Sequence, residues 1–163
     1  MTTARVHLPV PYEVRQLLDN LFSRRVEVMP GPPWAPLNGE PGTSAIYVDD
    51  SYVVRALGVC DVRFSAYAGA ALGLVPRGTA EAAVKQRSLD PGMKENLHEV
   101  LTICAALYNA EETPHLSLFQ VHHLGVEVAP QVQALGAVLG RRLDLRVDIS
   151  GYGAGRLSFV VVA

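Results

Sequence analysis

The segment from Leu89 to Asn109 reads LDPGMKENLHEVLTICAALYN, and the fold is best predicted from it. Apolar residues recur in it at the three- and four-residue spacing of one helix face, so it predicts an amphipathic helix. Asp90 followed by Pro91 fits an N-cap and a first-turn proline. The side expected to be buried consists of Met93, Leu97, Val100, Leu101, Cys104, Leu107 and Tyr108.

The opposite side of this helix carries a short polar line that ends in small residues. Its members are Glu95, Glu99, Thr102, Ala106 and Asn109. One helical turn sets the carboxylate of Glu99 beside the hydroxyl of Thr102. A solvated helix face usually carries charged residues along its whole length. The uncharged stretch at Ala106 therefore suggests a docking site for a partner. The alternative is an ordinary exposed face that happens to contain alanine.

Length and composition limit the number of domains and the class of function. The chain has 163 residues, enough for one domain with a core and too few for two of ordinary size, so we predict a single domain over residues 1–163. Apolar residues make up 49% and charged residues 18%, which excludes a disordered chain. A formal net charge of −2 gives no basic footprint for nucleic acid.

The sequence shows no recognisable targeting signal, and together with its two cysteines this predicts a cytoplasmic protein. No apolar run approaches the roughly 20 residues of a membrane span, and the first residues lack the layout of a signal peptide. We therefore expect no membrane partner. Cys60 and Cys104 stand alone in apolar settings, which predicts reduced core residues.

The remaining segments predict further helices and strands around the central helix. Helices are expected at 9–25, 65–74, 79–87 and 130–139, and strands at 26–29, 44–48, 53–60, 115–124, 143–149 and 156–162. Ser65 is expected to cap the second of these helices. This order predicts an α+β domain with a mixed, largely antiparallel sheet and long helices packed on one face.

A loop rich in proline and glycine interrupts this pattern at residues 30–42. Its sequence, PGPPWAPLNGEPG, cannot form regular structure because proline and glycine break helices and strands. Trp34, the only tryptophan, lies in it. We expect Trp34 to pack down and pin the loop, the alternative being a platform for a ligand.

Two other motifs invite chemical interpretations that the sequence does not favour. The GYGAG segment at 151–155 has glycine spacing like a phosphate-binding loop, but a strand follows it, so we interpret it as a hairpin turn. His115, His122 and His123 suggest a metal, yet His122 points away from the other two on a strand and no further ligand stands nearby. We expect no metal site.

Nucleophilic and cation-dependent hydrolysis also lack support in the sequence. Ser65 has no flanking glycines of a nucleophile elbow, and neither cysteine has a base nearby in sequence. The acidic pairs Asp49–Asp50 and Asp144/Asp148 could bind a cation, but carboxylates in turns and at strand edges are usually just solvated. The line of Glu95, Glu99 and Thr102 remains, where a carboxylate could pair with a partner's lysine and a neutral polar group could hold a water.

This layout resembles the CheC/CheX/FliY family of chemotaxis phosphatases. The residues that carry the resemblance are 97–105, LHEVLTICA, which look like the family's E-[IL]-x-N helix with Glu99 in the Glu position. A strand and helix at 59–74 before it and a terminal hairpin at 143–162 after it look similar as well. The resemblance in element order runs from about Pro11 to the C-terminus. It implies a CheX-like α+β domain.

The resemblance also implies an activity and a partner. Proteins of this family dephosphorylate the aspartyl phosphate of a CheY-type response regulator. Glu99 would pair with a lysine of the phosphorylated receiver domain, and Glu95, Ala106 and Asn109 would flank the contact. Any Mg²⁺ would belong to the receiver, so the chain would need no cofactor of its own. Thr102 stands in place of the family's water-orienting Asn, and losing one such hydrogen bond typically costs ~2.7–4 kcal/mol.

Three hypotheses follow from these observations. The first is a signalling protein that docks a CheY-like receiver domain through Glu99 and dephosphorylates it, with catalysis weakened by Thr102. The second is a non-catalytic interaction or dimerisation module, in which the apolar last strand, Phe159 to Val162, and the alternating strand that begins at Leu143 could extend a sheet between two chains. The third is a small-molecule-binding domain gated by the Trp34 loop, for which the sequence offers no polar constellation.

Overall fold

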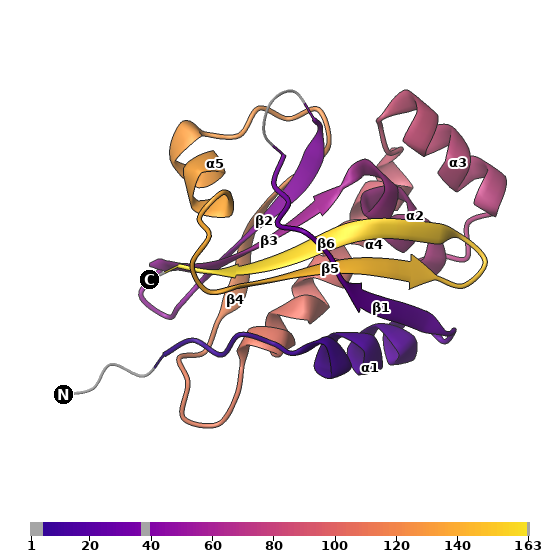
Figure 1. Cartoon of the computed structure of the whole chain (residues 1–163). Coiled ribbons are helices and arrows are strands. Elements are labelled where there is room, and N and C mark those ends of the chain that lie inside the picture. Colours follow the sequence, from indigo (N-terminus) through magenta and orange to yellow (C-terminus); the bar gives the residue numbers. More distant parts are fainter. Residues whose placement is uncertain (1–4, 37–39, 163) are drawn as a thin grey trace.

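The computed structural model describes residues 5–36 and 40–162, which form one six-stranded sheet with helices around it (Figure 1). The strands are β1 (Val26–Pro30), β2 (Gly42–Val48), β3 (Val54–Asp61), β4 (Ser117–His122), β5 (Arg142–Ile149) and β6 (Gly153–Val161). The helices are α1 (Pro11–Phe22), α2 (Val62–Leu72), α3 (Arg77–Gln86), α4 (Pro91–Cys104), a 3-10 turn η1 (Ala105–Tyr108) and α5 (Pro130–Gly136).

The strands lie in the order β1-β5-β6-β3-β2-β4, and every neighbouring pair is antiparallel. The predicted α+β class is confirmed, and the sheet is wholly antiparallel rather than mixed. Helices α1, α2 and α4 bury their apolar sides on one face, as expected. The short helix α5 packs Val132 and Leu135 on the other face, against Leu57 and Val160.

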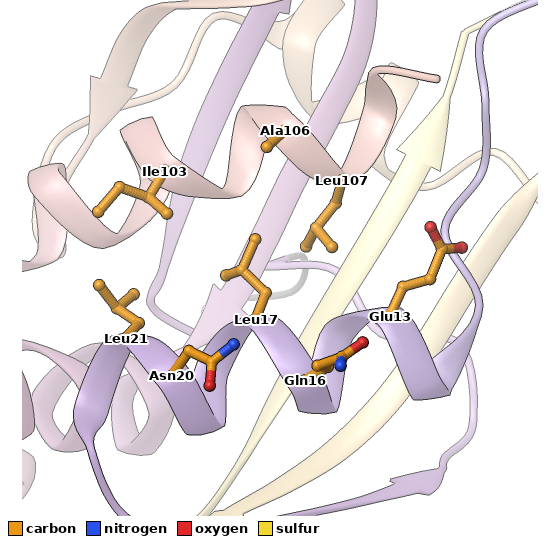
Figure 2. Close-up of a pocket in the computed structure, with 8 residues that line it drawn as sticks. All are labelled: Glu13, Gln16, Leu17, Asn20, Leu21, Ile103, Ala106 and Leu107. Atoms are coloured by element: carbon orange, nitrogen blue, oxygen red, sulfur yellow. The ribbon is translucent and has the colours of Figure 1, made fainter. Parts of the chain in front are cut away.

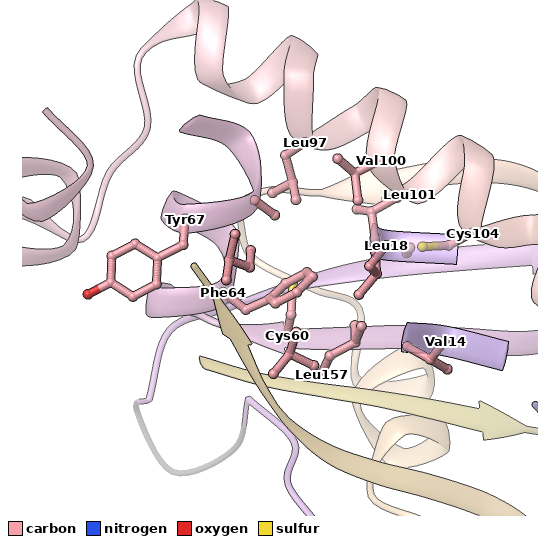
Figure 3. Packing of buried hydrophobic residues seen from close by; sticks show 14 of the residues in the cluster. Val14, Leu18, Cys60, Phe64, Tyr67, Leu97, Val100, Leu101, Cys104 and Leu157 are labelled. Carbon is pink, nitrogen blue, oxygen red and sulfur yellow. The ribbon is translucent and has the colours of Figure 1, made fainter. Parts of the chain in front are cut away.

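Helix α4 lies over the sheet with the predicted stripe turned inward. Met93, Leu97, Val100, Leu101, Cys104, Leu107 and Tyr108 are all buried, so this prediction is confirmed. In Figure 3 the side chains of α4 point toward Phe64 of α2, Leu18 of α1 and Leu157 of β6. Asp90 caps the helix by accepting a hydrogen bond from the Met93 amide (2.8 Å). The predicted single helix tightens into η1 for its last turn.

Two buried tyrosines fix the rotation of α4 above the sheet. The hydroxyl of Tyr47 on β2 donates to the carbonyl of Leu101 (2.7 Å), and the hydroxyl of Tyr108 donates to the carbonyl of Leu57 on β3. Their rings lie 5.1 Å apart, centroid to centroid. A buried hydroxyl needs a partner, so these bonds hold α4 in one orientation and determine which side faces solvent.

Close contact between α2 and α4 depends on a glycine. A Cβ atom added to Gly69 would lie 2.8 Å from the carbonyl oxygen of Met93. The amide of Asn96 donates to the Gly69 carbonyl (2.9 Å) across the same contact. The cost of glycine in a helix is thus offset here by a close approach of two backbones.

The start of α2 differs from the prediction. Asp61, not Ser65, is the N-cap, because its carboxylate accepts from the Phe64 amide (2.8 Å) at the point where β3 ends. Ser65 is fully buried inside α2, where its hydroxyl bonds to the carbonyl of Asp61 (2.7 Å) and to the hydroxyl of Thr43 (2.8 Å). Aspartate and serine are both good caps. Asp61 takes the position because β3 ends there and α2 begins at the next residue.

The terminal hairpin is confirmed, but its predicted role in dimerisation is wrong. GYGAG forms the turn between β5 and β6, with Gly151 and Gly153 at φ of +88° and +144°. However, β5 is paired with β1 and β6, and β6 with β5 and β3. Neither strand offers a free edge, so neither can extend the sheet into a second chain. The edge strands are β1 and β4.

The loop at 30–42 is shorter than predicted, because Pro30 belongs to β1 and Gly42 to β2. Its residues 37–39 lie outside the described residues. Trp34 is only 8% exposed, and its indole N–H donates to Glu40 (3.1 Å), so it packs down as expected. None of the helices in the described part of the chain is long and apolar enough to cross a membrane.

Candidate functional site

The predicted docking residues on α4 lie on its solvent side. Glu95, Glu99 and Thr102 of α4 and Ala106 of η1, which continues the helix, are all exposed, and we call them the α4 face. They share one side of the helix because they are three or four residues apart. Among the described residues Glu99 has no ion-pair or hydrogen-bond partner, so its carboxylate is free to meet a partner.

The hydroxyl of Thr102 is already engaged by its own helix. Its Oγ1 donates to the carbonyl of His98 (2.8 Å), one turn earlier, and lies 3.5 Å from the Nδ1 of His98. A hydroxyl has one hydrogen, so only the oxygen's lone pairs remain to accept a bond from a water. The arrangement can hold a water by acceptance but cannot also donate to it as an amide would.

Asn109 is placed differently from the rest of the predicted set. It is half-buried just beyond η1, where the backbone has become extended. Its side-chain amide donates to the carbonyl of Leu116 (3.1 Å) and its oxygen accepts from the Leu116 amide (2.8 Å). Both polar atoms are therefore used to hold the chain leading into β4, and we leave Asn109 out of the α4 face.

A groove that the sequence did not reveal runs beside the α4 face, between α4 and α1 (Figure 2). Its volume is about 570 Å³. Leu17 and Leu21 of α1 face Ile103 and Leu107 across it, and Ala106 lines it. The alanine gap noticed in the sequence thus opens onto a groove lined by these apolar side chains and by the polar Glu13, Gln16 and Asn20 of α1. The signal that could have found it is the second apolar line on α1, Leu17 and Leu21, one position before the buried Leu18 and Phe22.

The other flank of the α4 face carries ionisable side chains of both signs. Lys94 and His98 of α4 and His123, just after β4, line a hollow of about 270 Å³ together with Glu95. Burial lowers the pKa of His123, and the nearby Lys94, His98 and His122 lower it further. His122 is the last residue of β4 and His115 precedes the strand, so the three histidines do not share one strand face. Within the described residues no group of three or more His, Cys, Asp or Glu side chains could hold a metal ion.

The two cysteines are core residues, as predicted. Both are free and buried, and burial raises the pKa of each thiol to about 12. A thiol with such a pKa is almost entirely protonated at neutral pH and is a poor nucleophile. They contribute packing and no site for covalent chemistry.

The carboxylates at 49 and 144, considered above as cation ligands, are both paired with arginine. Asp49 bonds to the Nε of Arg55 (2.8 Å). Asp144 bonds to Arg142 (2.7 Å) and to the hydroxyl of Ser158 (2.6 Å), in a nearly buried cluster. Arg142 also donates to the carbonyl of Trp34 (2.9 Å), so this cluster fastens the Trp34 loop.

Known proteins resemble this chain in structure and not in sequence. No protein-family model matches the chain, and no curated protein matches it. Comparison with solved structures gives clear matches at low sequence identity. The middle domain of FliM from Vibrio alginolyticus is 10% identical, with 93% of this chain and 88% of that chain covered and a TM-score of 0.59.

Two further structures extend this likeness. The chemotaxis protein CheX from Desulfovibrio desulfuricans is 10% identical, with coverage of 93% of this chain and 97% of that one and a TM-score of 0.50. A structure of the FliG–FliM complex from H. pylori matches at 9% identity, with coverage of 93% and 85% and a TM-score of 0.51. The class defined by these structures is an α+β domain with one antiparallel sheet. More narrowly, this chain has the CheC/CheX-like fold that FliM middle domains share, and the resemblance in fold is confirmed.

Proposed function

We propose that this chain is a cytoplasmic chemotaxis or two-component signalling protein that docks a CheY-like receiver domain through the α4 face. The observation that carries the proposal is the Glu99 carboxylate, which is exposed and pairs with none of the described residues, on a helix whose orientation is fixed by Tyr47 and Tyr108. The fold supports it, because CheX has the same architecture and is a chemotaxis protein.

The surroundings of Glu99 fit a protein partner better than a small substrate. Ile103 and Ala106, within two turns of Glu99, line the open groove against α1. A groove with apolar side chains, beside a charge that pairs with none of the described residues, offers both a surface to bury and a group that sets the register of a partner. In this proposal Glu99 pairs with a lysine of the receiver domain, and Glu95 and Ala106 flank the contact.

We further propose that docking, and not hydrolysis, is the main activity. The hydrogen of the Thr102 hydroxyl is donated to His98, so Thr102 offers a water only an acceptor. A phosphatase reaction needs an in-line water held in a fixed orientation. The receiver would bring its own Mg²⁺ and phosphoryl group, so the chain itself requires no cofactor.

The test is the decay of phosphate on receiver domains from the same organism, mixed with the wild type, Glu99→Ala and Thr102→Asn. We expect tight binding with little acceleration by the wild type, a gain of roughly 100–1000-fold with Thr102→Asn, and no acceleration with Glu99→Ala. If no receiver binds the wild type, the proposal is wrong. If the wild type already accelerates the decay strongly, docking stands and the weak-catalyst part is wrong.

The second candidate is a non-catalytic interaction module that binds a different protein. The likeness to FliM favours it, because FliM of H. pylori forms a complex with FliG and has this fold. The two candidates make different predictions for the Thr102→Asn variant. If the chain is a module with no receiver partner, Thr102→Asn will not speed the decay of phosphate on any receiver. A pull-down will still find a protein partner, and Glu99→Lys will weaken the binding of that partner.

A further inference from the structure

A second cavity lies where the start of α2 and the end of α3 meet β6 and the Trp34 loop. Its volume is about 430 Å³, within the range of small-molecule sites. No residue of α4 lines it, so its role is independent of the docking proposal. Its apolar wall consists of Trp34, Pro41, Val62 and Val84.

Three arginines from distant parts of the sequence line this cavity. Arg63 belongs to α2, Arg87 is the C-cap of α3, and Arg156 lies on β6. Each is exposed, and none forms an ion pair or a side-chain hydrogen bond with another residue in the part of the chain that the structure describes. The guanidinium groups are thus available to a ligand.

Two carboxylates line the same cavity, and both are already bonded to N–H groups. Glu40 accepts from the indole of Trp34 (3.1 Å). Asp61 accepts from the amides of Phe64 (2.8 Å) and Arg156 (3.1 Å). The N-terminus of α2 is therefore capped and is not itself the binding feature. The lining contains three positive and two negative side chains, so it is positive on balance.

We propose that this cavity binds a small phosphorylated molecule. A guanidinium presents a fork of donors that matches phosphate or carboxylate oxygens. Three arginines on three elements suit a tetrahedral phosphoryl group, which offers acceptor oxygens in several directions, better than a planar carboxylate with two oxygens. The apolar wall provides room for an apolar part attached to the phosphate.

The single tryptophan makes the proposal directly measurable. Trp34 edges the cavity and is the only tryptophan, so its fluorescence reports on occupancy without labelling. AMP, pyrophosphate, adenosine and succinate are titrated separately into the full chain. We expect a saturable change with AMP and with pyrophosphate, none with adenosine, and much weaker binding of succinate. No saturable change with either phosphate compound, or equal binding of succinate, would overturn the proposal.

Variants locate the binding and separate it from the docking face. Arg63→Gln and Arg156→Gln should each weaken AMP binding roughly 10-fold, since each removes a charge-assisted hydrogen bond. Arg15→Gln, on the distant helix α1, and Glu99→Lys should leave AMP binding unchanged. Calorimetric titration provides a second readout, and far-UV circular dichroism confirms folding. Wild-type affinity in both Arg63→Gln and Arg156→Gln would place the ligand elsewhere and refute the assignment.

Discussion

On its buried side α4 meets the sheet and α2 through interlocked contacts, whereas its exposed side meets solvent and an open groove. The buried side includes Leu97, fully enclosed, and the backbone of Met93 pressed against Gly69. The exposed side carries Glu99, which has no partner among the described residues, and Thr102, bonded only within its own turn. The same helix thus combines a tightly packed inner side with an outer side that packs against no other element at Glu99 and Thr102.

This difference indicates what substitutions should do. Changes on the inner side should lower the free energy of unfolding, because they leave cavities or clashes in a packed interior. Changes on the outer side should leave that free energy nearly unchanged and alter binding instead. The predictions below test this division, beginning with the largest expected effect on stability.

Leu97→Ala should lower the free energy of unfolding by about 2–5 kcal/mol, because it removes a fully buried side chain and leaves a cavity. Urea unfolding followed by circular dichroism measures the effect. The matched control on the outer side is Thr102→Ala, for which we expect a change of at most about 0.5 kcal/mol. Equal losses for the two variants would contradict the division of α4 into two sides.

Gly69→Ala and Gly78→Ala form a pair with the same chemical change and opposite expected signs. At Gly69 the new methyl would meet the Met93 carbonyl, and we expect a loss of about 1–3 kcal/mol. At Gly78 in α3 nothing lies within 4 Å, and a gain of about 0.5 kcal/mol is expected from reduced freedom of the unfolded chain. Thermal unfolding of both variants checks the signs. A stabilised Gly69→Ala protein would show that α2 and α4 are not in close contact.

Alkaline pH should lower the free energy of unfolding through Cys104, on the inner side of α4. Burial raises the pKa of this thiol from 9.0 to about 12, so the folded state keeps the proton while the unfolded state loses it. The contribution to stability is complete below pH 9 and is lost as the pH rises toward 12, by at most about 1.4 kcal/mol per pH unit. Unfolding free energies above pH 9 should fall less steeply in Cys104→Ala than in the wild type. If the free energy of unfolding fell equally steeply with pH in the wild type and in Cys104→Ala, the raised pKa of Cys104 would be contradicted.

Glu99→Gln should have the smallest effect on stability, within about 0.5 kcal/mol, because the exposed carboxylate forms no ion pair or hydrogen bond with the described residues. Chemical denaturation at neutral pH measures it. A loss of more than about 1 kcal/mol would mean that Glu99 supports the fold, and its role as a free docking group would then be doubtful.

The sequence was sufficient to predict α4 because all of its determinants are local. Asp90 and Pro91 mark its start, and the spacing of Leu97, Leu101 and Cys104 shows which side is buried. The terminal hairpin follows in the same way from strict alternation and the glycine turn. Local spacing also gave the exposed position of Glu99 and Thr102.

The remaining features depend on contacts between distant segments, which periodicity does not encode. The strand order, which places β5 and β6 inside the sheet, is one example. The tie between Asn109 and Leu116 and the groove between α1 and α4 are others. The cavity arginines come from three separate elements, so no sequence motif joins them.

The central claim is that Glu99 contacts a receiver domain, and a binding measurement tests it most directly. Calorimetric titration of the organism's receiver domains into the wild type, Glu99→Lys and Glu127→Lys compares two identical charge reversals. Glu127 is an exposed glutamate outside α4. We predict that Glu99→Lys weakens binding at least roughly 10-fold, because it replaces a charge pair by repulsion, while Glu127→Lys binds like the wild type. Equal affinity of Glu99→Lys and the wild type would contradict the account.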